Sequence, residues 1–248
     1  MSCILALYLA LSPWLVVAAI PERAAPAQTQ TQDPDALYAR RDELSSAREA
    51  AAIWQQRLAA DPQNFEAAWK LARARYWLGG HLPEAERKAA LEAGTAAARA
   101  AIAVQPKRPE GHFWLAANMG ALAESFGLRQ GLKYRNEIKA ALLVVLQIDP
   151  AFQQGSADRA LGRWYFKVPG LFGGSKKKAE EHLRRSLTYD PDSTASRFFL
   201  AETLIDQNRR AEARTELQRV IDAPVDAEWG PEDREFKGKA RRVLDTLK

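Results

Sequence analysis

Residues 198–224 read FFLAETLIDQNRRAEARTELQRVIDAP, and this stretch decides the fold. Apolar side chains recur there every three to four positions on both sides of a polar segment, residues 206–210. Such spacing forms one face of a helix, and a polar cluster between two such faces predicts a turn. We therefore expect two helices that pack through alternating large and small side chains, namely Leu200, Ala201, Leu204, Ala213, Leu217 and Val220.

The proline that ends this stretch is the last of five that divide the chain at similar intervals. They stand at positions 62, 106, 150, 191 and 224, which gives spacings of 44, 44, 41 and 33 residues. Because proline lacks an N–H and clashes with the preceding turn, each one ends a helix. A large apolar residue lies four positions before each proline: Leu58, Ile102, Leu146, Leu187 and Val220.

A second landmark marks the other helix of each unit. It is a leucine followed by a small residue, which lets two helices approach closely: Leu71-Ala72, Leu115-Ala116, Leu161-Gly162 and Leu200-Ala201. This order of large and small residues, in a last unit of 33 residues, is the tetratricopeptide (TPR) pattern, whose repeat is about 34 residues long. We predict an all-α protein, a TPR-like helical-hairpin solenoid of about ten helices.

The expected helices follow from these landmarks. Residues 168–174, which contain Pro169 and three glycines, are expected to form a loop before a helix capped by Ser175. Leu171 and Phe172 in that loop are expected to tuck onto a neighbouring element. The last helix carries one apolar stripe, as suits the cap of a solenoid. The ten ranges are 34–60, 64–78, 83–104, 109–126, 130–148, 156–168, 176–188, 194–207, 210–222 and 231–247.

The amino terminus indicates export. Residues 3–20 are apolar except for Ser12, and the small-residue motif at 25–27 is typical of a signal peptidase site. We expect a signal peptide over 1–27, a polar linker over 28–33 and the solenoid over 34–248. The alternative is an uncleaved anchor over 3–20, because no Lys or Arg precedes the apolar run. In either case the solenoid is expected outside the cytoplasm, periplasmic or secreted, with membrane contact only through that segment.

Charge and residue types narrow the function classes. The 36 basic and 31 acidic residues are mixed along the chain, so nucleic acid is not an expected partner. The one cysteine, Cys3, leaves no disulfide framework and no thiol nucleophile in the solenoid. His81, His112 and His182 stand apart from one another and from acids at ligand spacing. We therefore expect no catalytic residues, no metal and no cofactor; an enzyme such as a helical hydrolase is the least favoured alternative.

Binding is the expected function. In TPR arrays the first helix of each pair lines the concave surface, and aromatic and arginine side chains supply much of the energy at recognition sites. The alternative for the aromatic residues is packing between helices, and for the two arginines of the third unit it is pairing with Asp158 or with Glu180 and Glu181. Counted from each leucine-small pair, the groove candidates are Trp69, Arg73, Tyr76, Phe113, Arg159, Arg163, Phe198 and Glu202.

Several motifs resemble a known family. FWLAAN at 113–118, GLKYR at 131–135, GSADRALGRWY at 155–165 and the VPG loop at 168–170 resemble the TatT family. TatT is the TPR-like component associated with periplasmic substrate-binding proteins of TRAP transporters. The resemblance implies a protein partner of that kind, a small hydrophobic ligand that passes through a pore, and a homo-oligomer. Lipid attachment at Cys3 is not implied, because the chain has no evident lipobox.

The same motifs also resemble the regulator of microtubule dynamics proteins of eukaryotes. The sequence therefore leaves two functions open. One is an adaptor for a TRAP-type substrate-binding protein or a small apolar ligand, and the other is a generic TPR scaffold for protein–protein interaction without a transport role.

Overall fold

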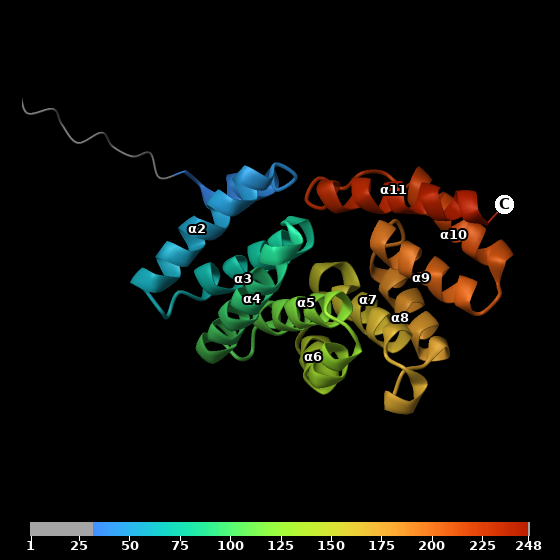
Figure 1. Cartoon of the computed structure of the whole chain (residues 1–248), viewed down its shortest axis with the longest axis horizontal. Helices are drawn as coiled ribbons and strands as arrows, with labels where there is room; N and C mark the ends of the chain where they lie inside the picture. The colour runs from blue at the N-terminus through green and yellow to red at the C-terminus, as the bar shows by residue number, and fades with distance from the viewer. Residues whose placement is uncertain (1–31, 248) are drawn as a thin grey trace, which may run out of the picture. The chain divides into compact units, whose positions relative to one another are not determined.

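Eleven α-helices and one short 3₁₀ turn, η1 (Gly170–Phe172), make up the residues that the computed structural model describes, 32–247 without the side chains of 128–130 (Figure 1). No strand occurs among them, which confirms the predicted all-α class. The helices are α1 (Pro34–Ala39), α2 (Leu44–Ala60), α3 (Phe65–His81), α4 (Glu84–Val104), α5 (Pro109–Ser125), α6 (Leu128–Ile148), α7 (Phe152–Lys167), α8 (Lys176–Tyr189), α9 (Thr194–Asp206), α10 (Arg210–Asp222) and α11 (Gly230–Thr246).

The predictions for the amino terminus fall outside this range. The signal peptide over 1–27, the alternative anchor over 3–20 and all but the last two residues of the linker are not among the described residues. Within residues 32–247, no helix has the length and apolar character that a membrane span requires.

The prolines end helices as predicted. Helices α2, α4, α6, α8 and α10 each stop two residues before the proline of their unit. The residue between helix and proline leaves helical geometry, as Asp149 does with a ψ of 98°. The next helix then begins at a polar cap in several units; the Asn64 side chain, for example, accepts a hydrogen bond of 2.9 Å from the N–H of Ala67.

One helix more is present than the ranges predicted, because residues 34–60 form two helices. At Arg40 and Arg41 the N–H groups bond back three residues, to Leu37 and Tyr38, which closes the short helix α1. The Arg41 carbonyl instead accepts a hydrogen bond of 2.7 Å from the indole N–H of Trp77 on α3. This bond ties the turn after α1 to α3, and the chain starts a new helix at Leu44.

The small residues of the leucine-small pairs bring helices together as predicted. A Cβ added at Gly162 in α7 would lie 2.5 Å from the Cγ of Leu183 in α8, closer than two carbon atoms can approach. Leu161 and Leu183 are themselves fully buried. Glycine is therefore required at this contact, and the α7–α8 pair packs at a distance that alanine would not permit.

The glycine-rich segment 168–174 is a loop as predicted, and Ser175 caps α8 by accepting from the N–H of Lys178. The expectation that Leu171 tucks onto a neighbour was wrong, because this side chain is 90% exposed. The loop closes on itself, with the N–H groups of Gly173 and Gly174 bonded to the carbonyls of Gly170 and Pro169. Leu171 lies at the outer tip of that turn. The centre of the Phe172 ring lies 5.6 Å from the Cζ atom of the Arg135 guanidinium.

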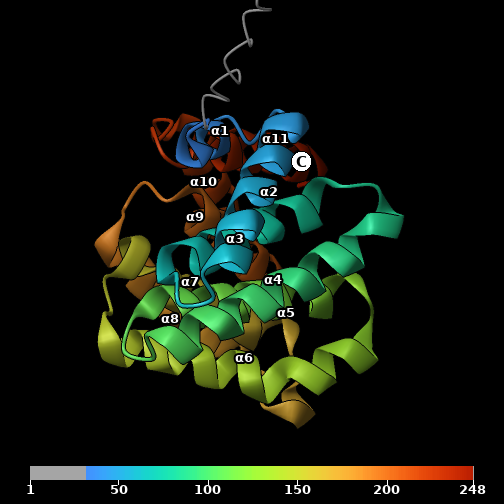
Figure 2. The ribbon, with the colours of Figure 1, turned by 90° about the vertical axis from the view of Figure 1, so that its left-hand side faces the viewer.

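Successive helices of the described unit pack side by side, and the chain curves until α11 returns to the side of α1 (Figures 1 and 2). The larger apolar core runs from Leu37 in α1 to Ala179 in α8, and a second core runs from Leu183 in α8 to Ala240 in α11. Side chains of α11 and of the segment around α1 and α3 meet through polar contacts, which we call the closing seam: Arg41–Glu232, Asp42–Arg234 and His81–Glu235.

Candidate functional site

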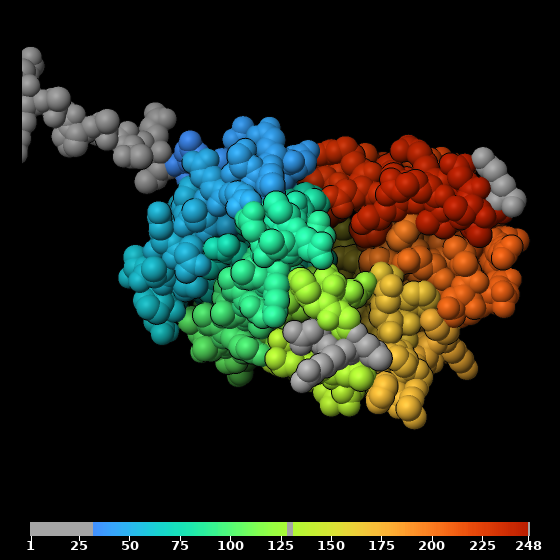
Figure 3. All heavy atoms as spheres, in the orientation of Figure 1, coloured from blue at the N-terminus to red at the C-terminus, as the bar shows by residue number. Residues whose placement is uncertain are grey.

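A cavity of about 1340 Å³ lies on the concave side of the array. Its wall comes from the first helices of the successive pairs, α3, α5, α7 and α9, together with α6 and α11. The space-filling view shows the face of the molecule hollowed below α11 and between α3 and α9 (Figure 3). This is the surface on which a TPR array presents its binding residues, so the groove candidates can be compared directly with the lining.

Six of the eight groove candidates line the cavity: Tyr76, Phe113, Arg159, Arg163, Phe198 and Glu202. Phe113 and Phe198 are also largely buried, and each packs against neighbouring rings, Phe113 on Phe152 and Phe198 on Phe236. Phe113 and Phe198 therefore both pack between helices and form part of the cavity wall.

Trp69 and Arg73 lie outside the cavity, because α1 covers this part of α3. The Arg73 guanidinium lies 4.1 Å from the centre of the Tyr38 ring and 3.5 Å from the Asp35 carboxylate, both on α1. It also lies 5.0 Å from the centre of the Trp69 ring. The sequence pattern gave these residues the same position as the lining ones, but it did not include a short helix folded over the first unit.

Arg163 is held in place by two carboxylates. It bonds to Glu124 on α5 at 2.9 Å and to Glu202 on α9 at 2.5 Å, so the alternative that it serves Asp158 or Glu180 and Glu181 was wrong. Burial alone would lower the pKa of Arg163, but the hydrogen bonds and charges of the two glutamates raise it. Asp158 faces α8 instead, where it meets His182 at 2.6 Å.

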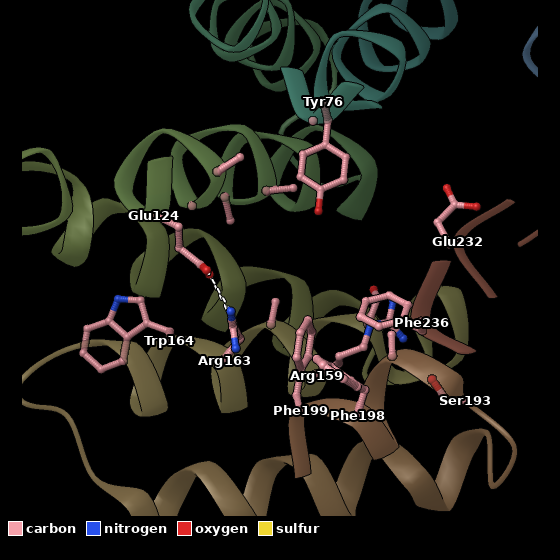
Figure 4. A pocket seen from close by; sticks show the side chains of 18 of the residues that line it. Tyr76, Glu124, Arg159, Arg163, Trp164, Ser193, Phe198, Phe199, Glu232 and Phe236 are labelled. Atoms are coloured by element: carbon pink, nitrogen blue, oxygen red, sulfur yellow. Dashed lines mark hydrogen bonds and ion pairs between the residues drawn. The ribbon is translucent and has the colours of Figure 1, made fainter. Parts of the chain in front are cut away.

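Arg159 lies one turn before Arg163 and has no such partner. Among the described residues, no hydrogen bond and no ion pair is made by its guanidinium, and burial lowers its pKa. Figure 4 shows this side chain beside the rings of Phe198, Phe199 and Phe236, with Tyr76 opposite. An arginine side chain is thus directed into the cavity without a carboxylate from the protein.

The acids that act electrostatically on Arg159 are, from the largest effect down, Asp190, Glu232 and Asp233. The Asp190 carboxylate lines the cavity and accepts a hydrogen bond of 3.0 Å from the N–H of Asp192, but it makes no ion pair among the described residues. Asp233 accepts a hydrogen bond of 2.5 Å from the Thr194 hydroxyl and another of 2.8 Å from the N–H of Asp226. Glu232 pairs with Arg41 in the closing seam. These carboxylates still favour the charged form of Arg159 from a distance, so its positive charge is retained.

An aromatic wall stands beside this charge. The rings of Phe198 and Phe199 on α9 each lie 5.5 Å from the ring of Phe236 on α11. The repeat position predicts Phe198 as a site residue but gives no indication of Phe199 or Phe236. Phe236 was visible only as part of the apolar stripe of the last helix, and nothing local to that stripe showed that it reaches the concave side.

Within 32–247, no group of three or more His, Cys, Asp or Glu side chains has an arrangement that could hold a metal ion. The three histidines make separate contacts, with Glu235, with the Pro106 carbonyl and with Asp158. The chemistry that the cavity offers is recognition of an apolar group next to a negative charge.

Solved structures with a similar fold are TPR proteins. The thermophilic TPR protein TTC0263 of Thermus thermophilus superposes with a TM-score of 0.64 at 21% identity, over 85% of this chain and 97% of that one. MamA superposes with a TM-score of 0.50 at 15% identity, over 84% of this chain and 98% of that one. No curated protein matches the sequence. These likenesses show the TPR-like solenoid fold that the sequence predicted.

Two family models match the sequence in adjoining segments. A tetratricopeptide repeat model matches residues 176–230, the part that holds the helix pair of standard length. The model described as regulator of microtubule dynamics protein 1-3 matches residues 31–177, more than half of the chain, and covers the long helix pairs that form most of the cavity. The chain therefore belongs to the regulator of microtubule dynamics protein 1-3 family.

Proposed function

We propose that this protein is a non-enzymatic adaptor that holds part of a partner molecule in the cavity of its helical array. TPR-type arrays are in general scaffolds for protein–protein interaction, and this chain has that architecture. The observation that carries the proposal is the unpaired Arg159 beside the Phe198–Phe236 contact inside a cavity of about 1340 Å³. A cavity of this size is larger than most small-molecule sites, and it can admit a peptide segment or an apolar ligand.

A finer form of the proposal adds the partner and the compartment. It places the protein in the periplasm, as an adaptor for a TRAP-type substrate-binding protein or for a small apolar ligand. Its support is the likeness of the segments at 113–118 and 155–165 to TatT, and the small-residue motif at 25–27 after an apolar run. The competing form is a generic scaffold with protein partners and no transport role.

The test is to fill the cavity without disturbing the fold. Gly120 lines the cavity in the middle of α5, and a Cβ added there would meet nothing within 4 Å. Gly120→Trp should therefore fold while it blocks the cavity. The matched control is Ala96→Trp, which adds the same side chain at an exposed position in the middle of α4, outside the cavity lining.

Affinity purification of the tagged protein from its native cells, followed by mass spectrometry, gives the readout. A partner that binds in the cavity is recovered with the wild type and with Ala96→Trp, and is lost with Gly120→Trp. If both variants recover the same partners as the wild type, the cavity is not the binding site. A transporter substrate-binding protein among the lost partners would support the finer form, and its absence in favour of other proteins would support the generic scaffold.

A further inference from the structure

We propose that Arg159 is the anion-binding residue of the cavity and that the ligand carries a single carboxylate attached to an apolar group. The carboxylate would bind the Arg159 guanidinium, and the apolar group would lie on the rings of Phe198, Phe199 and Phe236. This inference rests on the proposed function, because it names the chemistry of what the cavity binds.

Arg159 lines the cavity without an ion-pair partner among the described residues; Arg75 on α3 is a second half-buried arginine without one, but it lies outside the cavity lining. Arg41, Arg163 and Arg197 are also withdrawn from solvent, and each has a carboxylate within hydrogen-bonding distance. Arg159 is half-buried, so its side chain has lost part of its hydration and has gained no hydrogen bond from the protein in return, which costs free energy in the unliganded protein. A bound anion removes that cost, so the site is arranged to favour a negatively charged ligand.

The groups around Arg159 define the rest of the ligand. Figure 4 shows the rings of Phe198, Phe199 and Phe236 around the Arg159 side chain, with Tyr76 across the cavity. Tyr76 lines the cavity with 40% of its side chain exposed, and its hydroxyl can donate a second hydrogen bond to an oxygen held by Arg159. A planar carboxylate suits this pair of donors, because a guanidinium binds it through two parallel N–H···O bonds.

The charge of the wall limits the charge of the ligand. Acidic side chains outnumber basic ones among the lining residues, seven to five, and Arg163 is already neutralised by Glu124 and Glu202. A phosphate dianion or a polyanion would gain one cation and be repelled by the surplus acids. A monoanion with an apolar group would bind the same Arg159 guanidinium, and its apolar group would also contact the aromatic wall.

Two sources can supply this chemistry, the carboxylate of a peptide chain and a free aromatic or aliphatic acid. Phenylbutyrate and a hexapeptide that ends in phenylalanine with a free carboxylate serve as probes, each compared with its own amide. Isothermal titration of the full chain measures the dissociation constants. We expect at least one acid to bind about tenfold or more tightly than its amide, the loss that removal of a charged hydrogen-bonding partner causes. The acid that shows this difference identifies the source.

Three variants test the role of the residue. Arg159→Gln should weaken binding of the acid to the level of the amide, whereas Arg159→Lys should retain part of the preference. Arg57→Gln, which removes an exposed arginine at the end of α2, should leave both affinities unchanged. The melting temperature separates a binding role from a structural one. Free Arg159→Gln should melt at or above the wild-type temperature, because the substitution removes an uncompensated charge, yet it should lose the rise that the acid produces in the wild type.

The outcomes distinguish this inference from the proposed function. If the amides bind as tightly as the acids, if Arg159→Gln binds the acids like the wild type, or if that variant melts several degrees lower, the inference is overturned. It is also overturned if the wild type binds neither acid. In each of these cases, partners lost with Gly120→Trp and kept with Ala96→Trp would still uphold the cavity as the binding site.

Discussion

The contacts between successive helices and the contacts of the closing seam are built from opposite kinds of side chain. Between α7 and α8, fully buried leucines meet across Gly162, and no charge takes part at the point of closest approach. At the closing seam, by contrast, Arg41 lies almost fully buried against Glu232 and against the carbonyl of Glu228. The apolar cores reach up to this seam from both sides but do not cross it within the described residues.

The helix pairs and the closure of the array's ends are therefore stabilised by different interactions. Apolar burial fixes each helix pair and depends little on pH or salt. Ion pairs contribute less, because much of their attraction is offset by loss of water; burial raises the pKa of Glu232 even beside Arg41. We therefore expect the closing seam to open locally before the array unfolds. Because Glu232 also lines the cavity, such opening would widen access to it.

The largest effect is expected where the two apolar cores meet. Leu183 belongs to the second core and contacts Gly162 beside the first, so Leu183→Ala leaves a void between α7 and α8. We expect the free energy of unfolding to fall by about 2–5 kcal/mol, measured by urea denaturation. Leu171→Ala, at a side chain that is 90% exposed, should change it by less than about 0.5 kcal/mol. Equal effects of the two substitutions would contradict the assignment of the core.

A smaller and more local effect is expected at the seam. Arg41→Met removes hydrogen bonds to Glu232 at 2.9 Å and to the Glu228 carbonyl at 2.6 Å, and it leaves Glu232 without its partner. We expect a loss of about 2 kcal/mol, part of which returns when Glu232→Leu is added, because the unpaired charge is then removed. Hydrogen exchange should speed up in α1 and α11.

The amides of α5 to α8 serve as the internal control for the Arg41 variant. Their exchange should stay slow, because their apolar contacts are intact. If exchange instead speeds up uniformly over the whole array, the closing seam and the contacts between successive helices unfold together. The expected difference in stability between them would then be wrong.

The sequence predicted the apolar contacts between successive helices because their determinants are local. Pro150 ends α6, and Gly162 permits close packing, for reasons that each unit carries within itself. The closing seam has no local determinant. Arg41 bonds to a residue 191 positions away, and its carbonyl bonds to Trp77, 36 positions away. The break between α1 and α2 lies at the residue that makes these distant bonds, and the apolar periodicity of residues 34–60 did not indicate it.

The candidate site likewise contains residues that the sequence predicted and residues whose role depends on distant partners. The repeat position placed Phe198 and both arginines of α7 on the concave side, where the structure has them. It could not distinguish Arg159 from Arg163, because both of their repeat positions, one turn apart, face the groove. Their difference arises because Glu124, 39 residues from Arg163, reaches one guanidinium and not the other. Phe236 likewise enters the wall only because α11 returns across the array.

The smallest effect is expected from pH at the same seam. His81 donates to the Trp77 carbonyl at 2.7 Å and meets the Glu235 carboxylate at 2.5 Å. Burial alone would lower the pKa of His81, but these hydrogen bonds and the charges of Glu235 and Glu232 raise it above its ordinary value of 6.5. The contribution to stability is therefore complete below about pH 6.5 and is lost as the pH rises through the raised pKa.

Raising the pH from about 6 to about 8.5 should thus loosen the seam, and the cost should stay below about 1 kcal/mol because solvent reaches both side chains. The melting temperature and the exchange rates of α11 report it, and His81→Gln should remove the difference between the two pH values. Arg234→Ala breaks the exposed pair with Asp42 and leaves the His81–Glu235 contact in place, so it should lower the melting temperature alike at both pH values. If the melting temperature of His81→Gln still differs between the two pH values, a group other than His81 is responsible. The charge pairs of the closing seam would then not depend on pH in this range.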